Sequence, residues 1–367
     1  MKKKNDLGAF ISKNMKKKEK INREWYSLRG MLSYSWAQQI FLIGGREAGK
    51  SYAVGDLYVS QWKTKGRPFF WLRLDDASAS KLLMNNAEKL IDADIRRRWN
   101  LDIVTVGDAV YEVTKRGEKK EDGRPGKIIE KKLMARVLSL STFYNDKGSA
   151  LFDKDFLNDP KMYFNVVLDE MNKEMSQANR FDIVYCYVNE LENIIRSTKD
   201  RVRVICIGNT LEEASDLLVA TGFIPETFGR YKLKKKRIVM EYIEPSEKYL
   251  NRRKGTIQDT MSGNSSTFTN VIDVDRTLIS KKRLRKPSYV VAFTNTDKFT
   301  VWDGNVVAPY NNEKCNVIAM RPYLDFLFET KARDTVMQLF DTRSYRFRNL
   351  VTQKIFKKNL ALLKPRK

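Results

Sequence analysis

The sequence predicts an α/β protein, in which a first domain built on a mostly parallel sheet is followed by a smaller α+β domain. Two observations support this prediction. From about residue 31 to residue 210, short β-rich apolar runs alternate with helical patterns, which is typical of a parallel sheet flanked by helices. Beyond residue 210 the pattern changes to basic runs, isolated β-like segments and one helical run.

Five apolar runs are the expected core strands of the first domain. Each run is continuous, as expected for parallel strands that are buried on both faces. The runs are Gln39–Ile43, Phe69–Leu72, Val137–Leu140, Phe164–Leu168 and Val202–Ile207. An amphipathic helix is expected before the last run, because Val184, Tyr187, Val188, Leu191, Ile194 and Ile195 form a stripe with a 3.6-residue period. The charged, glycine-containing stretch Lys115–Lys132 predicts a hairpin or a mobile loop.

Changes in composition divide the chain into four parts. They are a basic arm or surface helix over residues 1–30, the first domain over 31–230, a basic lid or linker over 231–266 and a C-terminal domain over 267–367. The third part begins within the basic run Arg230–Arg237. It is expected to contain a short basic helix over Glu247–Lys254 and to end in the flexible segment Ser262–Ser266. The last part is expected to hold strands over Tyr289–Thr294 and Phe299–Trp302, a helix over Tyr323–Phe340 and a basic tail, Arg343–Lys367.

The charge balance indicates a polyanionic partner. The chain has 69 lysines and arginines against 45 acidic residues, which gives a net charge of +24. A protein this basic is expected to bind nucleic acid or an anionic membrane surface, and the alternative is a soluble basic protein without such a partner. No apolar run approaches the roughly 18 residues of a membrane span, so a membrane is not the expected partner.

Histidine is absent, and the three cysteines are isolated from one another in the sequence. These counts exclude histidine-based acid–base catalysis, Ser-His triads and Cys/His zinc sites. Any catalysis must therefore use carboxylates, lysine, arginine and a hard metal ion. The N-terminus lacks an apolar stretch long enough for a signal peptide, so the protein is expected to stay in the cytoplasm.

One segment matches the phosphate-binding pattern G-x-x-x-x-G-K-[ST], and it lies between an expected strand and an expected helix. It consists of Gly44, Gly45, Arg46, Glu47, Ala48, Gly49, Lys50 and Ser51. The glycines let successive N–H groups point inward around phosphate oxygens, at the positive end of the following helix. Lys50 is expected to bridge the β- and γ-phosphates, and the Ser51 hydroxyl to ligate Mg²⁺. The sequence therefore predicts a P-loop domain that binds ATP with Mg²⁺.

Asp169 and Glu170 follow the expected strand Phe164–Leu168. At the carboxyl edge of the sheet, Asp169 can hold Mg²⁺ beside the phosphate loop, and Glu170 can polarise the attacking water as a general base. An acidic residue pair after an apolar strand is by itself a common strand end, but it becomes a strong signal after a phosphate loop in the same sheet. A glutamate directly after the aspartate predicts the ASCE branch of P-loop ATPases, in which an added strand separates the two motifs.

Asn209 follows the strand Val202–Ile207. Its position suits a polar sensor of the γ-phosphate or the attacking water, and the alternative is an ordinary turn asparagine.

These residues resemble the DNA-packaging ATPases of small podophages of the phi-29 type. The resembling segments are MLSY, IGGREAGKSYA, FFWLR, FNVVLDEMNKE and IIRSTKDRVRVICIGNT, which together run over most of the chain. The resemblance supports the roles of Lys50, Ser51, Asp169 and Glu170 given above. It also implies that Arg196 is the arginine finger that each subunit inserts into its neighbour's site. Two weaker matches imply coupling or trans-acting roles for Arg73 and Lys147.

The resemblance further implies a homo-oligomeric ring, expected to be a pentamer, at the portal vertex of an empty capsid in the infected host cell. Its partners would be double-stranded DNA, the portal and, as a further alternative, a structural RNA. The resemblance also implies that the C-terminal domain is a vestigial RNase H-like nuclease without catalysis. The residues agree with this, because Ser288–Thr294 carries no carboxylate and only Asp297 and Asp303 lie nearby. Two alternatives stay open: a cellular or plasmid translocase or helicase, and an ATP-gated nucleic-acid-binding protein without processive activity.

Overall fold

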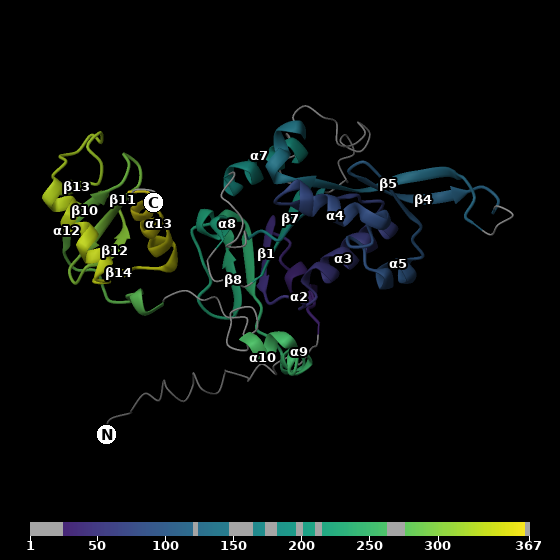
Figure 1. The fold of residues 1–367 in the computed structure, drawn as a ribbon, viewed down its shortest axis with the longest axis horizontal. Coiled ribbons are helices and arrows are strands. Elements are labelled where there is room, and N and C mark those ends of the chain that lie inside the picture. The colour runs from purple at the N-terminus through teal and green to yellow at the C-terminus, as the bar shows by residue number, and fades with distance from the viewer. Residues whose placement is uncertain are drawn as a thin grey trace, which may run out of the picture.

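The computed structural model describes residues 25–119, 124–146, 164–172, 182–195, 201–209, 215–262 and 276–363 of the 367-residue chain. It contains two α/β units, each built on its own sheet (Figure 1). The larger sheet belongs to the first part of the chain, and the smaller sheet begins at residue 287. Among the described residues, no helix is both long enough and apolar enough to cross a membrane.

The larger sheet has nine strands in the order β3-β4-β5-β2-β6-β7-β1-β9-β8. From β5 to β9 in this order, every neighbouring pair of strands is parallel, whereas β3, β4 and β8 pair antiparallel. The strands are β1 (Gln39–Gly44), β2 (Phe69–Arg73), β3 (Ile103–Val106), β4 (Ala109–Arg116), β5 (Ile128–Ser139), β6 (Phe164–Asp169), β7 (Val202–Asn209), β8 (Gly229–Leu233) and β9 (Ile238–Tyr242). The predicted mostly parallel sheet is confirmed, and β7 separates β1 from β6 as the Asp-Glu pair predicts.

Helices cover both faces of this sheet, so alternate residues of each central strand enter different cores. In β2, for example, Phe70 and Leu72 pack with one face and Phe69 and Trp71 with the other. The helices and 3₁₀ turns of this unit are α2 (Arg29–Leu32), α3 (Lys50–Lys65), α4 (Asp76–Ala87), α5 (Ala93–Trp99), η1 (Leu140–Asp146), α7 (Ile183–Ile195), α8 (Asp216–Ala220), η2 (Lys234–Lys236), α9 (Glu247–Arg253) and α10 (Ile257–Ser262). Burial on both faces explains why these strands are continuous apolar runs.

The second unit is a mixed five-stranded sheet with the order β13-β10-β11-β12-β14. Its elements are η3 (Arg276–Leu278), β10 (Pro287–Ala292), β11 (Lys298–Trp302), β12 (Val306–Pro309), β13 (Val317–Ala319), α12 (Thr330–Asp341), β14 (Arg346–Phe347) and α13 (Leu350–Ala361). Phe356 of α13 is fully buried among four aromatic rings of the sheet and its connections, with ring centroids 5.2–5.6 Å away. Helix α13 also contacts α8 of the first unit, where Lys354 Nζ lies 3.8 Å from Asp216 Oδ1.

Two predictions for the second unit are only partly correct. The predicted helix Tyr323–Phe340 begins only at Thr330, and Tyr323 and Leu327 are exposed in the preceding loop. There Asp325 accepts a hydrogen bond from Asn295, so a tertiary contact replaces a helical turn. The predicted basic tail Arg343–Lys367 instead contains β14 and α13. The many lysines of this segment obscure its apolar pattern in the sequence, although Leu350, Phe356 and Leu360 are buried and are spaced for one face of a helix.

The predictions for the charged segments have mixed outcomes. The hairpin expected over Lys115–Lys132 is confirmed as the antiparallel pair β4 and β5, although β5 begins earlier than the apolar run that predicted it. The basic run Arg230–Arg237 forms β8 and η2, and β8 and β9 both lie in the larger sheet. Most of the expected linker Ser262–Ser266 lies outside the described residues.

Candidate nucleotide site

The loop from Gly44 to Lys50 connects the end of β1 to the first turn of α3. Two of its residues have positive φ, with values of 60° for Glu47 and 85° for Gly49. Two features favour glycine at position 49. Its backbone is left-handed, and a Cβ there would lie 3.2 Å from the ring of Trp25. The loop therefore has the turn and the helix start that a phosphate-binding loop needs.

The Lys50 side chain is buried inside this loop. Its Nζ donates hydrogen bonds to the carbonyl oxygens of Gly44 at 2.9 Å and Gly45 at 2.6 Å, and lies 3.4 Å from Asn209 Oδ1. Burial lowers the pKa of Lys50 to about 8, although the nearby Asp169 carboxylate acts in the opposite direction. The ammonium group is thus placed where phosphate oxygens of a nucleotide would meet it.

Asp169 lies at the carboxyl end of β6 and faces the first turn of α3. Its Oδ1 accepts hydrogen bonds from the Ser51 hydroxyl and from the Glu170 backbone N–H, both at 3.1 Å. The carboxylate is buried, and this burial raises its pKa, while the adjacent Arg73 favours the charged form. A hydroxyl and a carboxylate that converge in this way are the hard oxygen donors that suit Mg²⁺.

Arg73 ends β2 and bridges the two acidic residues of the neighbouring strand. Its Nη2 lies 3.1 Å from Asp169 Oδ2, and its Nη1 contacts Glu170 Oε2. Glu170 has a positive φ of 58°, and its carboxylate is largely exposed. The tight backbone turn directs the Glu170 side chain away from the buried position of Asp169 and towards Arg73.

Asn209 ends β7 directly beside Gly44 in the parallel register of β7 and β1. Its carbonyl oxygen accepts a hydrogen bond of 2.9 Å from Asn172 Nδ2, while its Oδ1 faces Lys50. A Cβ at the preceding Gly208 would lie 2.6 Å from Met171 Cε, so a larger residue there would require the Met171 side chain to move. The side chain of Asn209 is thereby held at the carboxyl edge of the sheet.

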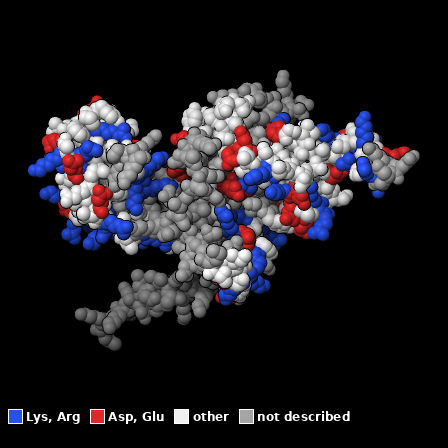
Figure 2. All heavy atoms as spheres, in the orientation of Figure 1, with Lys and Arg blue, Asp and Glu red and all other residues white. Residues whose placement is uncertain are grey.

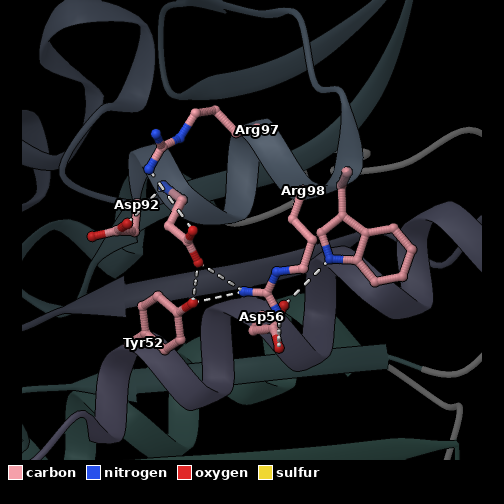
Figure 3. Close-up of polar contacts among 7 residues, drawn as sticks. Tyr52, Asp56, Asp92, Arg97 and Arg98 are labelled. Atoms are coloured by element: carbon pink, nitrogen blue, oxygen red, sulfur yellow. Dashed lines mark hydrogen bonds and ion pairs between the residues drawn. The ribbon is translucent and has the colours of Figure 1, made fainter.

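A polar network anchors the helix that follows the loop (Figure 3). The Tyr52 hydroxyl donates to Asp94 Oδ2 and accepts from Arg98 Nη2, each at 2.6 Å. Arg98 Nη1 also reaches Asp56 Oδ2 at 3.2 Å, and Trp99 Nε1 donates to Asp56 Oδ1 at 3.3 Å. These contacts join α3 to α5 one residue after Ser51.

The structure brings together six of the predicted site residues, which are Lys50, Ser51, Arg73, Asp169, Glu170 and Asn209. Lys147 and Arg196 lie outside the described residues, and α7 ends at Ile195. Asn172 is not predicted from the sequence, and neither is a group of residues from α9 and from the chain before α2 that contact the outside of the loop. No local motif identifies the α9 residues, because their contacts join positions about 200 residues apart.

The net positive charge is not gathered into one patch on the face shown in Figure 2, where acidic side chains lie among the basic ones on both units. Part of the run Arg230–Arg237 is used inside the protein. Arg230 Nε donates to Glu241 at 2.7 Å, and Lys236 Nζ donates to the Thr221 carbonyl at 2.5 Å. These two cations therefore have a structural role.

Solved structures with a similar fold include proteins of viral packaging motors. The chain is similar to a chain of the bacteriophage Phi-29 viral genome packaging motor assembly, with a TM-score of 0.62 and 19% identity over 93% of this chain and 100% of that one. It has the fold of a packaging-motor protein. The Phi-28 gp11 DNA packaging motor shares this packaging-motor fold with a TM-score of 0.56 and 16% identity over 94% of this chain and 99% of the other. No family model and no curated protein sequence matches this sequence.

Proposed function

We propose that this protein is an ATP-driven motor that moves double-stranded viral DNA into a preformed capsid. The observation that carries the proposal is the convergence of Lys50, Ser51, Asp169 and Glu170 at one sheet edge, with β7 between the two motif strands. The packaging-motor fold over nearly the whole chain supports the same function.

The residues of the site have distinct roles in hydrolysis. Inward N–H groups of the loop and the Lys50 ammonium bind the phosphates and stabilise the charge of the transferring phosphoryl group. Glu170 accepts a proton from the attacking water, and Asn209 orients the γ-phosphate or this water. Arg73 holds both carboxylates in place through the contacts described above.

The donor set fits Mg²⁺. Ser51 and Asp169 offer a hydroxyl and a carboxylate at the edge of the loop, and Mg²⁺ in nucleotide sites is bound by one or two such groups together with phosphate oxygens. When bound, the ion would neutralise charge on the β- and γ-phosphates.

The proposed motor works as a homo-oligomeric ring, expected to be a pentamer, at the portal vertex in the infected host cell. Arg196 would act from one subunit on the next, with Lys147 as a further residue across the interface. DNA would be contacted through backbone phosphates without base readout, and the portal or a structural RNA would be bound by the basic surfaces. The C-terminal unit is proposed to be a nuclease-like domain without nuclease activity.

The test is whether purified protein hydrolyses ATP faster with double-stranded DNA and fills empty capsids with DNA. A phage lacking this protein should accumulate empty capsids. DNA-stimulated hydrolysis without any effect on capsid filling would favour a cellular or plasmid translocase. ATP hydrolysis that DNA does not stimulate would favour an ATP-gated nucleic-acid-binding protein.

A further inference from the structure

Helix α9 lies against the outside of the phosphate loop and donates three hydrogen bonds to its backbone. The Tyr249 hydroxyl donates to the Arg46 carbonyl oxygen at 2.8 Å, and Arg253 Nη1 donates to the same oxygen at 3.3 Å. Arg252 Nη2 donates to the Glu47 carbonyl oxygen at 2.7 Å. One short helix about 200 residues further along the chain therefore holds two consecutive carbonyls of the loop.

The chain before α2 holds the third carbonyl. The backbone N–H of Tyr26 donates to the Ala48 carbonyl oxygen at 2.9 Å. The neighbouring Trp25 ring packs against Gly49 and is stacked by the Arg252 guanidinium, 3.8 Å from the ring centroid. The donors of α9 and those of the N-terminal segment thus form one layer, which we name the outer strap (Trp25, Tyr26, Tyr249, Arg252 and Arg253).

Because the peptide bond is planar, the outward contacts of the carbonyl groups also fix the orientation of the backbone N–H groups of the loop. In a trans peptide, the C=O of one residue and the N–H of the next point in opposite directions. Because the outer strap holds the carbonyls of Arg46, Glu47 and Ala48 outward, the N–H groups of Glu47, Ala48 and Gly49 point inward. By contrast, the carbonyls of Gly44 and Gly45 accept hydrogen bonds from Lys50 inside the loop.

The positions of the strap residues fit a dedicated role. Tyr249 and Arg253 are 2% and 3% exposed, and Arg253 Nη1 also donates to the Tyr249 hydroxyl at 2.5 Å. Glu47, whose carbonyl Arg252 holds, has a φ of 60°, which a non-glycine residue adopts at a cost. Contacts from outside stabilise this conformation, and the guanidinium groups also add positive potential behind the loop.

We propose that Tyr249, Arg252 and Arg253 are positioning residues that orient the N–H groups of the loop for the nucleotide phosphates. This proposal rests on the proposed function of the loop as an ATP site. It assigns to α9, which the sequence predicts only as a basic helix, the pre-organisation of the phosphate-binding backbone. The residues would not touch the nucleotide, so they should affect its binding more than its hydrolysis.

The experiment measures the Kd for Mg-ADP by calorimetry, and the KM and kcat for Mg-ATP, in the full-length protein. Arg252→Ala and Tyr249→Phe are each expected to raise Kd and KM about tenfold, as for the loss of one hydrogen bond, and to change kcat less than twofold. Arg252→Lys should recover part of the loss. Lys254→Ala, which removes an exposed cation next to the strap, is the matched control and should behave as the wild type.

The variant Lys50→Ala separates failure of this proposal from failure of the ATP site. If Lys50→Ala loses Mg-ADP binding while Arg252→Ala and Tyr249→Phe bind as the wild type does, the positioning role is wrong. A fall in kcat with unchanged Kd and KM would also overturn it. If Lys50→Ala binds Mg-ADP as the wild type does, the nucleotide site itself is wrong and the positioning role falls with it. Tyr249→Phe keeps the packing of the ring, so its result stands even if Arg252→Ala fails to fold.

Discussion

The guanidinium of Arg73 lies 3.1 Å from the carboxylate of Asp169, from the end of the adjacent parallel strand. The same guanidinium contacts Glu170, so one cation faces both acidic residues of the site. Burial raises the pKa of Asp169, and the positive charge of Arg73 acts in the opposite direction by favouring the ionised carboxylate. Arg73 is thus placed to determine the charge and orientation of the residues that would bind Mg²⁺ and activate water.

Arg73→Ala is therefore expected to lower kcat for ATP by about tenfold or more, the order expected for the loss of charge-assisted hydrogen bonds. Arg73→Lys should lie between this variant and the wild type, because it keeps the charge but loses the two-pronged contact. The measurement is steady-state hydrolysis with Mg-ATP. Arg136→Ala on β5, where Arg136 pairs with Asp108 at 2.7 Å, is the matched control. Equal activity of Arg73→Ala and the control would show that Arg73 has no role in hydrolysis.

Lys50 and Glu170 should fail in different ways. Lys50→Ala is expected to abolish hydrolysis and to weaken nucleotide binding, because the ammonium stabilises the phosphate charge both in bound ATP and in the transition state. Glu170→Gln keeps the shape of the side chain but cannot accept a proton, so it should bind ATP with little turnover. Nucleotide binding by calorimetry and phosphate release measure the two properties separately. Near-wild-type turnover by Glu170→Gln would exclude the general-base role.

The C-terminal unit should not cut DNA. Asp297 and Asp303 flank the two ends of β11, which places them roughly 20 Å apart at about 3.3 Å per residue. Two-metal catalysis needs carboxylates that converge on two metal ions about 3.5–4 Å apart, and the described residues contain no cluster of three or more potential metal ligands of the types His, Cys, Asp and Glu. Incubation of plasmid DNA with the full-length protein and Mn²⁺ or Mg²⁺ is expected to leave it intact. Cleavage that disappears in Asp297→Asn or Asp303→Asn would contradict the vestigial role.

Phe356 should determine the stability of the C-terminal unit. Its side chain is fully buried in the aromatic cluster of this unit, and its truncation would leave a cavity. Phe356→Ala is expected to cost about 3–5 kcal/mol in the free energy of unfolding. Lys358→Ala, on the exposed side of α13, should change it by less than about 0.5 kcal/mol. Urea denaturation followed by circular dichroism compares the two, and an equal effect would place Phe356 outside the core.

The central sheet could be predicted because its strands carry their own signal. A strand buried on both faces is a continuous apolar run, and β1, β2, β6 and β7 all follow such runs. The β5 strand extends beyond its run, because its first half lies in an exposed hairpin where Lys131 and Lys132 are tolerated. In α13 the buried positions are separated by lysines, so composition concealed a helix whose burial only the tertiary structure defines.

The chemical centre of the site was predictable for a similar reason. Asp169 and Glu170 lie at the end of β6, and Lys50 and Ser51 begin the helix that follows the loop after β1. Parallel strands bring these strand ends to one edge. The outer strap was not predictable, since Tyr249 and Arg252 reach the loop only after β9 pairs with β1 and returns the chain to it. Contacts that depend on such long-range pairing leave no periodic or local pattern in the sequence.

The predicted finger Arg196 can be tested by mixing two defective proteins. Arg196 directly follows α7, so the alternative is that it complements the negative end of this helix, a contribution of about 0.3–1 kcal/mol to stability. A finger acts in trans, and such arginines raise the hydrolysis rate by several orders of magnitude. Arg196→Ala and Glu170→Gln should therefore each be inactive alone.

Mixed rings should recover part of the activity, because a Glu170→Gln subunit still offers Arg196 to a neighbour whose Lys50, Asp169 and Glu170 are intact. The measurement is ATP hydrolysis by mixtures at several ratios, with ring mixing verified by two different tags. A mixture of Arg196→Ala with Lys50→Ala should recover activity in the same way, since the Lys50→Ala subunit also keeps its finger. If Arg196→Ala alone keeps most of its activity, the helix-end role is correct. If it is inactive and verified mixed rings stay inactive, Arg196 acts within its own subunit and the trans role is wrong.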